Sequence, residues 1–427
     1  MKKHLLWLAA LTVAVSANAQ EQSAYPSDFG EAYALLGETI EVPIKVTNNG
    51  TAEVKNISYT IATDGVVGEE VTIDVPTIAS KGKATLPIPF AAGTEATRSE
   101  KVFTITKVNG VDNQATRTSA SGSIVTLLTK INAVPVVEEF TGTWCGWCPR
   151  GFVALQKADE IYGDNVVLIA VHYNDPMQID GYGPVLNTVS GFPDARMNRS
   201  LDFDPNPTTI CSYIDNAMEN IAPATIKATA QWSNKMKASI TFKTKTTFLF
   251  SADDVNYALA YVLTENGLSG TGSSWNQSNY YSGRSDEEME FWTSAGSSVS
   301  GIVYDHVAVG AWEIGTGKSG SVPTTVVAGE PQEFSFTANV SSNSVIQDKT
   351  KLQAVVLLID VNTNTIVNAV KTDVLEYGAA NAINDMEQDN SEAVARYTLD
   401  GRRVNSSHKG INIVKYADGR TVKTLVK

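Results

Sequence analysis

Strict alternation of apolar and polar residues dominates the chain from about residue 37 to residue 130. In "TIEVPIKVTNNG" every second position is apolar until a turn at Asn49-Gly50, and "VKNISYTIATDG" repeats the pattern before Asp64-Gly65. A period of two is typical of half-buried strands joined by tight turns. Short strands at this spacing predict an immunoglobulin-like β-sandwich over residues 20–130.

The pattern changes at about Ile131. "AVPVVEEF" predicts a short strand, and "NVVLIAVHYND" is a continuous apolar run, typical of a strand buried on both faces. "PRGFVALQKADEIYGD" has helical spacing, with Phe152, Leu155 and Ile161 on one face, and "NPTTICSYIDNAMENI" predicts a second helix. Residues 131–223 are therefore expected to form an α/β domain.

Strand patterns return after residue 224 and predict a second β-sandwich over residues 224–377, interrupted by long loops between Leu268 and Ser300. Residues 378–393 read as a polar linker. Residues 394–427 contain three turn signals between strand-like runs, so we expect a small separate β-module there.

The N-terminal residues carry an export signal. "MKKHLLWLAALTVAVSANAQ" has a basic start, an apolar stretch and the small-x-small site Ala17-Asn18-Ala19, which predicts a signal peptide over residues 1–19. No later apolar run reaches about 18 residues, so no transmembrane segment is expected. The formal net charge of −13 disfavours nucleic-acid partners. We expect an exported protein of the outer membrane, cell surface or medium; the sequence leaves its oligomeric state open.

The chain has only three cysteines, too few for a disulfide-stapled scaffold. Two of them form the pair Cys145-x-x-Cys148 at the start of a predicted helix, where unpaired N–H groups and the helix dipole favour a thiolate. A working thiol pair competes here with a static disulfide or inert thiols. Zinc is disfavoured, because a structural site needs four ligands and the chain has four histidines in all.

This segment resembles the thioredoxin superfamily through Trp144-Cys145-Gly146-Trp147-Cys148-Pro149 and the downstream "VSGFPDARMNR". The resemblance implies an exposed nucleophile at Cys145, a resolving thiol at Cys148 and a cis-proline at Pro193. It implies no cofactor and no metal. The resemblance also implies that Glu139 is a buried acid that relays protons, although this position is more often Asp in the superfamily. It further implies a substrate groove formed by Trp144, Trp147 and Phe192.

Weaker signals have simpler interpretations. "GTGKSG" lacks the first glycine of a phosphate loop, and "DFDPNP" lacks the glycine and glutamate of an EF-hand, although Asp202 and Asp204 leave a loop cation open. His306 lies among apolar residues and is expected to be a core or edge histidine. Cys211 is expected to be a buried free thiol, with a third redox partner as the alternative.

The C-terminal tail resembles the sorting domains of type nine secretion in Bacteroidetes-type bacteria. The matching residues are Leu399-Asp400-Gly401-Arg402, Lys409-Gly410-Ile411 and Val426-Lys427. The order of signal peptide, β-domain, CxxC segment, β-domain and tail resembles the outer-membrane-protein-28-related family of such bacteria, which implies the outer membrane or the cell surface.

Two functions from different classes follow from these features. One is a thiol–disulfide oxidoreductase that acts on protein thiols or disulfides of the cell envelope. The other is a non-enzymatic surface binding or adhesion protein whose β-domains bind the partner and whose CxxC is vestigial or structural. The cysteine pair favours the first, and the two large β-domains favour the second.

Overall fold

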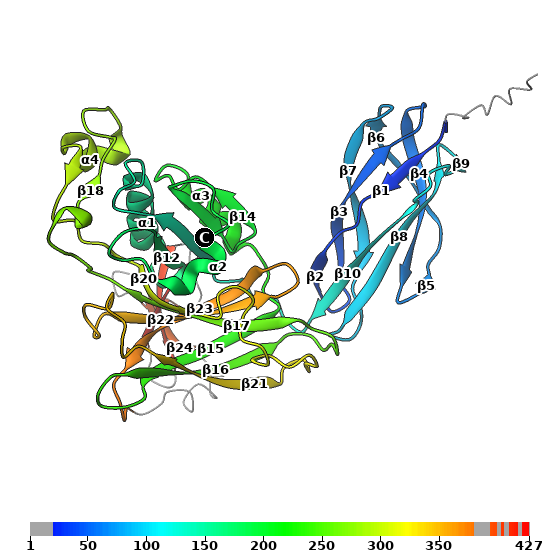
Figure 1. Ribbon diagram of the computed structural model, residues 1–427. Coiled ribbons are helices and arrows are strands. Elements are labelled where there is room, and N and C mark those ends of the chain that lie inside the picture. Colours follow the sequence, from blue (N-terminus) through cyan, green and yellow to red (C-terminus); the bar gives the residue numbers. More distant parts are fainter. Residues whose placement is uncertain (1–19, 380–392, 399–402, 405–409, 417–420, 427) are drawn as a thin grey trace, which may run out of the picture.

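The structure is a computed structural model that describes residues 20–379, 393–398, 403–404, 410–416 and 421–426. It contains an N-terminal lobe, a larger main lobe and a small C-terminal sheet (Figure 1). The predicted signal peptide lies outside the described residues, as does the predicted linker apart from its two ends.

The N-terminal lobe is built from two facing sheets, as the alternating pattern predicts. One has the strand order β1-β3-β7 and the other β2-β10-β8-β4-β5, with β6 beside β4 and β9 beside β8. Apolar residues of both sheets, such as Ile44 and Ile88 of the first and Phe103 of the second, form one core. The strands are β1 (Ala24–Pro26), β2 (Glu31–Leu35), β3 (Thr39–Asn48), β4 (Val54–Thr63), β5 (Val66–Val67), β6 (Val71–Ile78), β7 (Lys83–Ala91), β8 (Arg98–Val108), β9 (Val111–Asp112) and β10 (Ser119–Leu127).

The main lobe is organised around one sheet of eleven strands, in the order β14-β13-β11-β12-β20-β17-β22-β23-β15-β16-β21. Strand β11, third from one edge of this sheet, runs parallel to β12 and antiparallel to β13. The strands are β11 (Val136–Thr141), β12 (Val167–His172), β13 (Asp194–Met197), β14 (Leu201–Phe203), β15 (Ala224–Trp232), β16 (Ser239–Phe248), β17 (Tyr257–Glu265), β20 (Val307–Trp312), β21 (Pro331–Asn339), β22 (Leu352–Asp360) and β23 (Thr365–Leu375).

Helices cover both faces of the strands around β11. Helix α1 (Pro149–Tyr162) and helix α3 (Ile210–Met218) share a core with Val137 and Leu168 on one face. Helix α2 (Gly183–Leu186) packs on the opposite face. The predicted helix over residues 149–164 is confirmed, but its buried face is Ala154, Leu155 and Ala158, whereas Ile161 is exposed.

The expected boundary between residues 131–223 and residues 224–377 does not separate two sheets. Strand β20 pairs with β12 at Ala170 and Val307, and a single core joins Val136 of β11 to Val262 of β17 and Leu357 of β22. All nine residues of β17 are buried. A strand buried on both faces belongs in the middle of a covered sheet rather than at the surface of a sandwich. The second β-rich region therefore extends the sheet of the α/β region.

Beyond β23 the sheet curls back beneath itself. Strands β15, β16 and β21 lie below β17, β22 and β23 in Figure 1, and β15 pairs with β23 through only two residue pairs. Aromatic rings fill the space between the layers: Tyr261 of β17 stacks on Phe336 of β21 at 4.3 Å and contacts Phe242 of β16 at 5.0 Å. This part has the layered character expected of a sandwich.

The region predicted as long loops, residues 268–300, contains short elements that lie against the start of α1. They are β18 (Gln277–Ser278) paired with β19 (Ser298–Val299), α4 (Glu290–Ser294), and the 3₁₀ turns η3 (Ser273–Trp275) and η4 (Glu287–Met289); η1 (Gly163–Asn165) and η2 (Asp180–Tyr182) lie elsewhere in the main lobe. Of the helices that the structure describes, none has the length and apolar character needed to cross a membrane.

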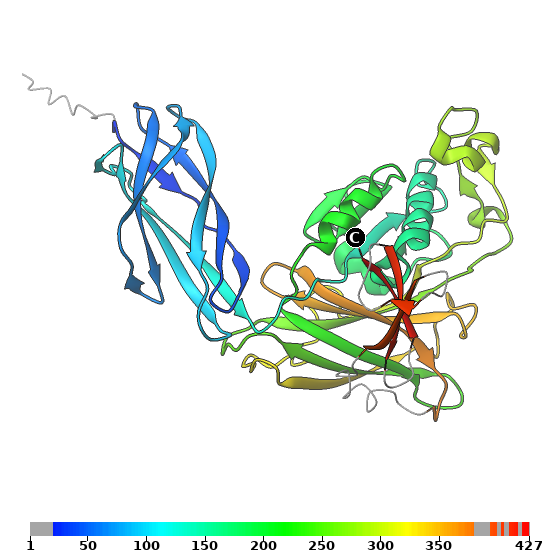
Figure 2. The ribbon, with the colours of Figure 1, turned by 180° about the vertical axis from the view of Figure 1, so that it is seen from behind.

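The described C-terminal residues form a sheet of their own, in the order β25-β24-β26-β27, with no strand pairing to the other described strands. Figure 2 shows these strands, in red, on the part of the main lobe that lies away from the N-terminal lobe. Their bounds are β24 (Ala393–Thr398), β25 (Arg403–Val404), β26 (Gly410–Tyr416) and β27 (Thr421–Val426).

A buried ion pair fixes the turn after β13 to strand β11. Glu138 of β11 is fully buried and accepts hydrogen bonds from Arg199 Nε at 2.8 Å and Nη2 at 2.7 Å. Tyr182 donates its hydroxyl to the same carboxylate, and Arg199 also donates to the carbonyl oxygen of Ile314. Tyr182 and Arg199 therefore meet at the Glu138 carboxylate, and Arg199 links it to the segment that contains Ile314.

We expect Arg199→Met to lower the free energy of unfolding by about 3–5 kcal/mol, because it leaves Glu138 charged and unpaired in the core. Calorimetric unfolding measures the loss. Arg117→Met removes an exposed ion pair with Asp28 and serves as the control, with an expected change below about 1 kcal/mol. Equal effects of the two substitutions would show that the buried pair has no special role.

Candidate functional site

The CxxC motif lies between strand β11 and the first long helix, α1. β11 ends at Thr141, a short loop follows, and Cys148 occupies the N-cap position of α1, with Pro149 in the first turn where a missing N–H costs nothing. Cys145 and Cys148 are joined in a disulfide. Only 4% of Cys145 and 1% of Cys148 are exposed. Cys145 is the more exposed of the two, but the expectation of an openly accessible nucleophile is wrong for this state.

Residues 273–281, which we call the cap segment, cover the motif. Their backbone and one side chain donate hydrogen bonds to carbonyl oxygens of the CxxC loop. The bonds are Ser278 N to Thr143 O at 2.7 Å, Gln277 Nε2 to Cys145 O at 2.9 Å and Tyr280 N to Gly146 O at 2.9 Å. The sequence showed only a loop rich in Gly, Ser, Asn and Tyr here, and no local signal placed it on the cysteines.

The two residues between the cysteines fit the cap segment closely. A Cβ atom on Gly146 would lie 2.4 Å from the ring of Tyr280, so the ring occupies the space that a side chain would take. The ring of Trp147 meets those of Tyr280 and Tyr281 edge-on at 5.5 Å, and the Arg284 guanidinium lies 4.7 Å from it. Trp147, expected in a substrate groove, thus contacts the chain's own segment.

A separate aromatic cluster stays open to solvent beside Cys145. Trp144 is 46% exposed and meets Phe192 edge-on at 5.5 Å, while Tyr173, 41% exposed, stacks on Phe192 at 5.6 Å. The Phe192–Pro193 peptide bond is cis, as predicted, and the contact of Phe192 with Trp144 brings this turn to the CxxC loop. Tyr173 was missed because only the fold brings it to the cluster.

A polar hollow of about 370 Å³ lies next to this aromatic cluster, between Trp144 and the cap segment. Eight of its nine lining residues carry a hydroxyl, amide or carboxylate group, although apolar atoms also contribute to its surface. The residues are Thr143, Trp144, Asn174, Asp175, Ser273, Ser274, Asn276, Ser278 and Ser298. Such groups can hydrogen-bond an extended peptide backbone.

Glu139 lies in the core against the first turn of α1, which follows Cys148. It is 1% exposed, and its Oε1 atom has no hydrogen-bond partner among the described residues. A Cβ atom on Gly151 would lie 2.3 Å from this oxygen, so the absence of a side chain there lets the carboxyl approach α1 three residues after Cys148. Burial raises the pKa of Glu139 to about 8, against a lowering effect of a hydrogen bond with Thr141. The carboxyl is therefore mostly neutral at pH 7.

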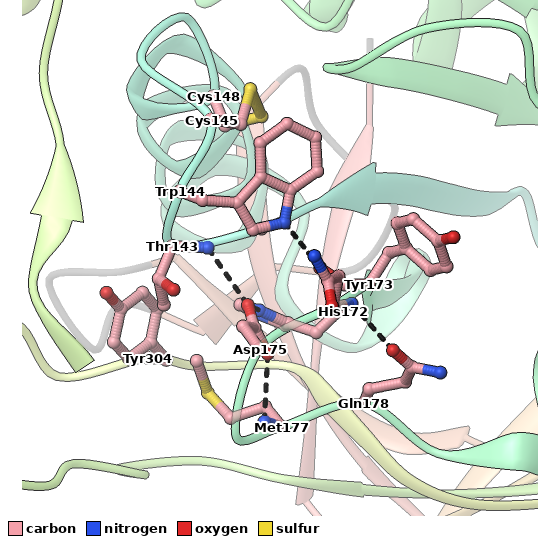
Figure 3. A network of polar contacts seen from close by, with 12 residues as sticks. Thr143, Trp144, Cys145, Cys148, His172, Tyr173, Asp175, Met177, Gln178 and Tyr304 are labelled. Carbon is pink, nitrogen blue, oxygen red and sulfur yellow. Dashed lines mark hydrogen bonds and ion pairs between the residues drawn. A yellow bond between two sulfur atoms is a disulfide. The ribbon is translucent and has the colours of Figure 1, made fainter. Parts of the chain in front are cut away.

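A polar network supports the CxxC loop from below (Figure 3). Asp175 accepts a hydrogen bond from Thr143 N at 2.9 Å and from Met177 N at 2.9 Å, and its Oδ2 lies 2.6 Å from His172 Nδ1. Trp144 donates its indole N–H to the carbonyl oxygen of Tyr173 at 2.7 Å. These bonds tie the loop before Cys145 to the end of β12.

The remaining candidates do not join the site. Cys211 is a half-buried free thiol on α3. Asp202 and Asp204, considered for a loop cation, form ion pairs with Arg196 at 3.1 Å and Arg150 at 2.5 Å. Within the described residues, no group of three or more His, Cys, Asp and Glu side chains is arranged to hold a metal ion.

No family model and no curated protein matches this sequence. HBP35 of Porphyromonas gingivalis is similar in structure, with 17% identity, 70% of this chain and 99% of that chain covered, and a TM-score of 0.43. A domain of the outer membrane lipoprotein Omp28 from the same organism has 13% identity, coverages of 36% and 90%, and a TM-score of 0.20. The CARDB domain of PF1109 from Pyrococcus furiosus has 14% identity, coverages of 26% and 99%, and a TM-score of 0.21. Identities and scores this low identify no function.

We expect Gly146→Ala to open the site, because the new methyl group would displace the Tyr280 ring. Losing this ring contact and its neighbouring hydrogen bond should speed reduction of the disulfide by dithiothreitol by roughly tenfold. Thiol release measures the rate. Gly30→Ala is the matched control, since a Cβ there meets nothing within 4 Å. An unchanged rate in Gly146→Ala would mean that the cap segment does not limit access.

The buried carboxyl also predicts a pH dependence of stability. Because the folded pKa of Glu139 is about 8, above its ordinary value of 4.5, its contribution is fully present below pH 4.5 and is lost as the pH rises through 8. Relative to Glu139→Gln, the free energy of unfolding of the wild-type protein should fall by up to about 1.4 kcal/mol per pH unit across this window. Chemical denaturation at several pH values measures the difference. The exposed Glu160→Gln is the control, and its curve should parallel the wild type; a parallel Glu139→Gln curve would contradict the buried neutral carboxyl.

Proposed function

We propose that the Cys145–Cys148 pair is the redox centre of an envelope thiol–disulfide oxidoreductase that acts on protein thiols or disulfides. The arrangement of β11, α1, β12, the cis-proline turn, β13 and α3 supports a thioredoxin-like assignment of this region. The N-terminal signal-like stretch supports export to the envelope.

The buried Glu139 carboxyl, whose Oε1 atom has no hydrogen-bond partner among the described residues, is the observation that carries the proposal. A buried carboxyl oxygen left without a partner costs on the order of 1–3 kcal/mol of stability, and a disulfide that only holds the fold together has no need of one. The neighbouring Glu138 shows the usual solution, since Arg199 neutralises it. A carboxyl with a pKa of about 8 beside the cysteine pair can hold or release a proton near neutral pH.

In the proposed reaction the reduced protein donates electrons to a substrate disulfide. The Cys145 thiolate attacks one sulfur, forms a mixed disulfide and releases the first substrate thiol. Glu139 first releases its own proton to solvent and, as a carboxylate, takes the proton of the Cys148 thiol. The Cys148 sulfur then attacks Cys145 Sγ. The Cys145–Cys148 bond forms and the second substrate thiol leaves. The substrate gains two electrons and two protons, and an external dithiol must reduce the pair again.

The exposed aromatic cluster supplies the face for a polypeptide substrate. Trp144, Tyr173 and Phe192 lie together next to Cys145 and Pro193, and the polar hollow adjoins them. Aromatic side chains favour apolar contacts with a bound chain, while hydroxyl and amide groups can pair its backbone. This combination suits an extended peptide segment that carries a cysteine.

A structural disulfide in a surface binding protein is the second candidate, and the burial of both cysteines under the cap segment favours it. In that case the pair would stay oxidised throughout the life of the protein. The two candidates differ in whether the cap segment ever leaves the motif.

We expect Cys148→Ser to accumulate mixed disulfides with envelope proteins through Cys145, because the resolving thiol is absent. Non-reducing electrophoresis of cells quenched with acid measures the adducts, and reducing agent should release them. Cys145→Ser and Cys211→Ser are matched controls that differ by the same single atom. Adducts in Cys211→Ser alone, or none in Cys148→Ser, would favour the structural disulfide.

A further inference from the structure

A small, mostly enclosed cavity lies between helix α1 and the strands that carry Glu139 and His172. Its volume is about 20 Å³, which is room for one water molecule. Polar groups from five elements or loops reach it, among them Glu139 on β11, His172 on β12, Gln277 in the cap segment and His306 just before β20. Glu139, whose Oε1 atom has no hydrogen-bond partner among the described residues, is one of the residues that line this cavity.

The redox chemistry proposed above requires a proton to cross this buried region. In the proposed reaction, closing the disulfide removes the proton of the Cys148 thiol, while Glu139, whose pKa burial raises to about 8, carries a proton of its own at pH 7. Each half-cycle therefore moves one proton between the site and solvent. Neither group is open to solvent, since they are 1% exposed, so the proton needs a defined exit.

We propose that this exit runs from Glu139 through a water molecule in the cavity to His306 and from there to Asp159 at the surface. The inference rests on the proposed function and adds a proton-relaying residue to it. His306 Nε2 lies 3.8 Å from Asp159 Oδ2, and the Asp159 side chain is 46% exposed on the outer face of α1. A proton that reaches the imidazole can therefore pass to the solvent-exposed carboxylate of Asp159 and from there to bulk water.

His306 suits this role better than His172, the other histidine on the cavity. The His172 ring is tied to Asp175, and their side chains are 3% and 1% exposed, so a proton passed to this pair stays buried. Burial lowers the pKa of His306. The positive charge of Lys371 lowers this pKa further, whereas the negative charges of Asp159 and Asp305 raise it. A neutral imidazole accepts a proton on one nitrogen and releases one from the other.

The backbone of His306 is held independently of its ring. The amide of Ala170 donates to His306 O at 2.8 Å, and His306 N donates to Asn266 Oδ1 at 2.7 Å. Its φ of +57° is a conformation that Gly and Asn adopt readily. His306→Gly and His306→Asn should therefore keep the fold while they remove the relay, and the glycine variant leaves space for free imidazole.

The test measures the rate at which oxidised glutathione oxidises the reduced protein, with tryptophan fluorescence as the readout, between pH 6 and pH 9. The protein gives up two electrons and forms its disulfide, and glutathione leaves as two thiols. At pH 6 we expect both His306 variants to close the disulfide at least tenfold more slowly than the wild type, as for loss of a general base. Imidazole in solution should restore the rate in His306→Gly but not in His306→Asn. At pH 9, where Glu139 has already lost its proton, all three rates should agree.

The outcomes separate this inference from the function beneath it. Wild-type rates in both variants at pH 6, a defect that persists unchanged at pH 9, or a defect in His306→Gly that imidazole leaves in place would each overturn the relay. In the Glu139→Gln background, replacing His306 should have no further effect, and an additive loss would also contradict it. A wild-type pair that glutathione cannot close would overturn the proposed function itself.

Discussion

Two neighbouring acids in one buried strand set the character of this protein. Glu138 and Glu139 point to opposite faces of β11, and both are almost completely removed from solvent. Arg199 and Tyr182 neutralise Glu138 and, through it, hold together segments that are far apart in sequence. No ion pair is found for Glu139 among the described residues, and its Oε1 atom has no hydrogen-bond partner there, which is the observation behind the role we propose for it with the cysteine pair.

The disulfide sits between two surfaces with different tasks. On one side lie Glu139 and the small cavity, to which we assign the proton transfer of the proposed reaction, and Asp175 fixes the loop through Thr143. On the other side, the cap segment covers Gly146 and Trp147 and leaves the aromatic cluster around Trp144 free. A substrate would therefore meet the aromatic cluster first and reach the disulfide only where the cap segment gives way. In this account, the position of the cap segment would control whether a substrate reaches the disulfide, in addition to the chemistry of the cysteine pair.

Local sequence predicted what depends on neighbours along the chain. The N-terminal sandwich, helix α1 and the cis bond before Pro193 follow from alternation, helical spacing and one motif. The shared sheet did not follow, because the pairing of β20 with β12 joins residues far apart in sequence. The sequence of β17, in which apolar and polar residues do not alternate, was a signal that this strand is buried on both faces, as all nine of its residues are. The cap segment could not be found either, since Gly, Ser and Asn carry no pattern for packing on another loop.

The protonation of Glu139 tests the account most directly. Carbon-13 NMR of the glutamate carboxyls, with the resonance assigned by its absence in Glu139→Gln, follows one group through a pH titration of the oxidised protein. The account predicts a midpoint near 8, with the carboxyl neutral at pH 7. A midpoint near the ordinary value of about 4.3 would show a charged, solvated carboxylate and contradict the proton-handling role on which the proposed function rests.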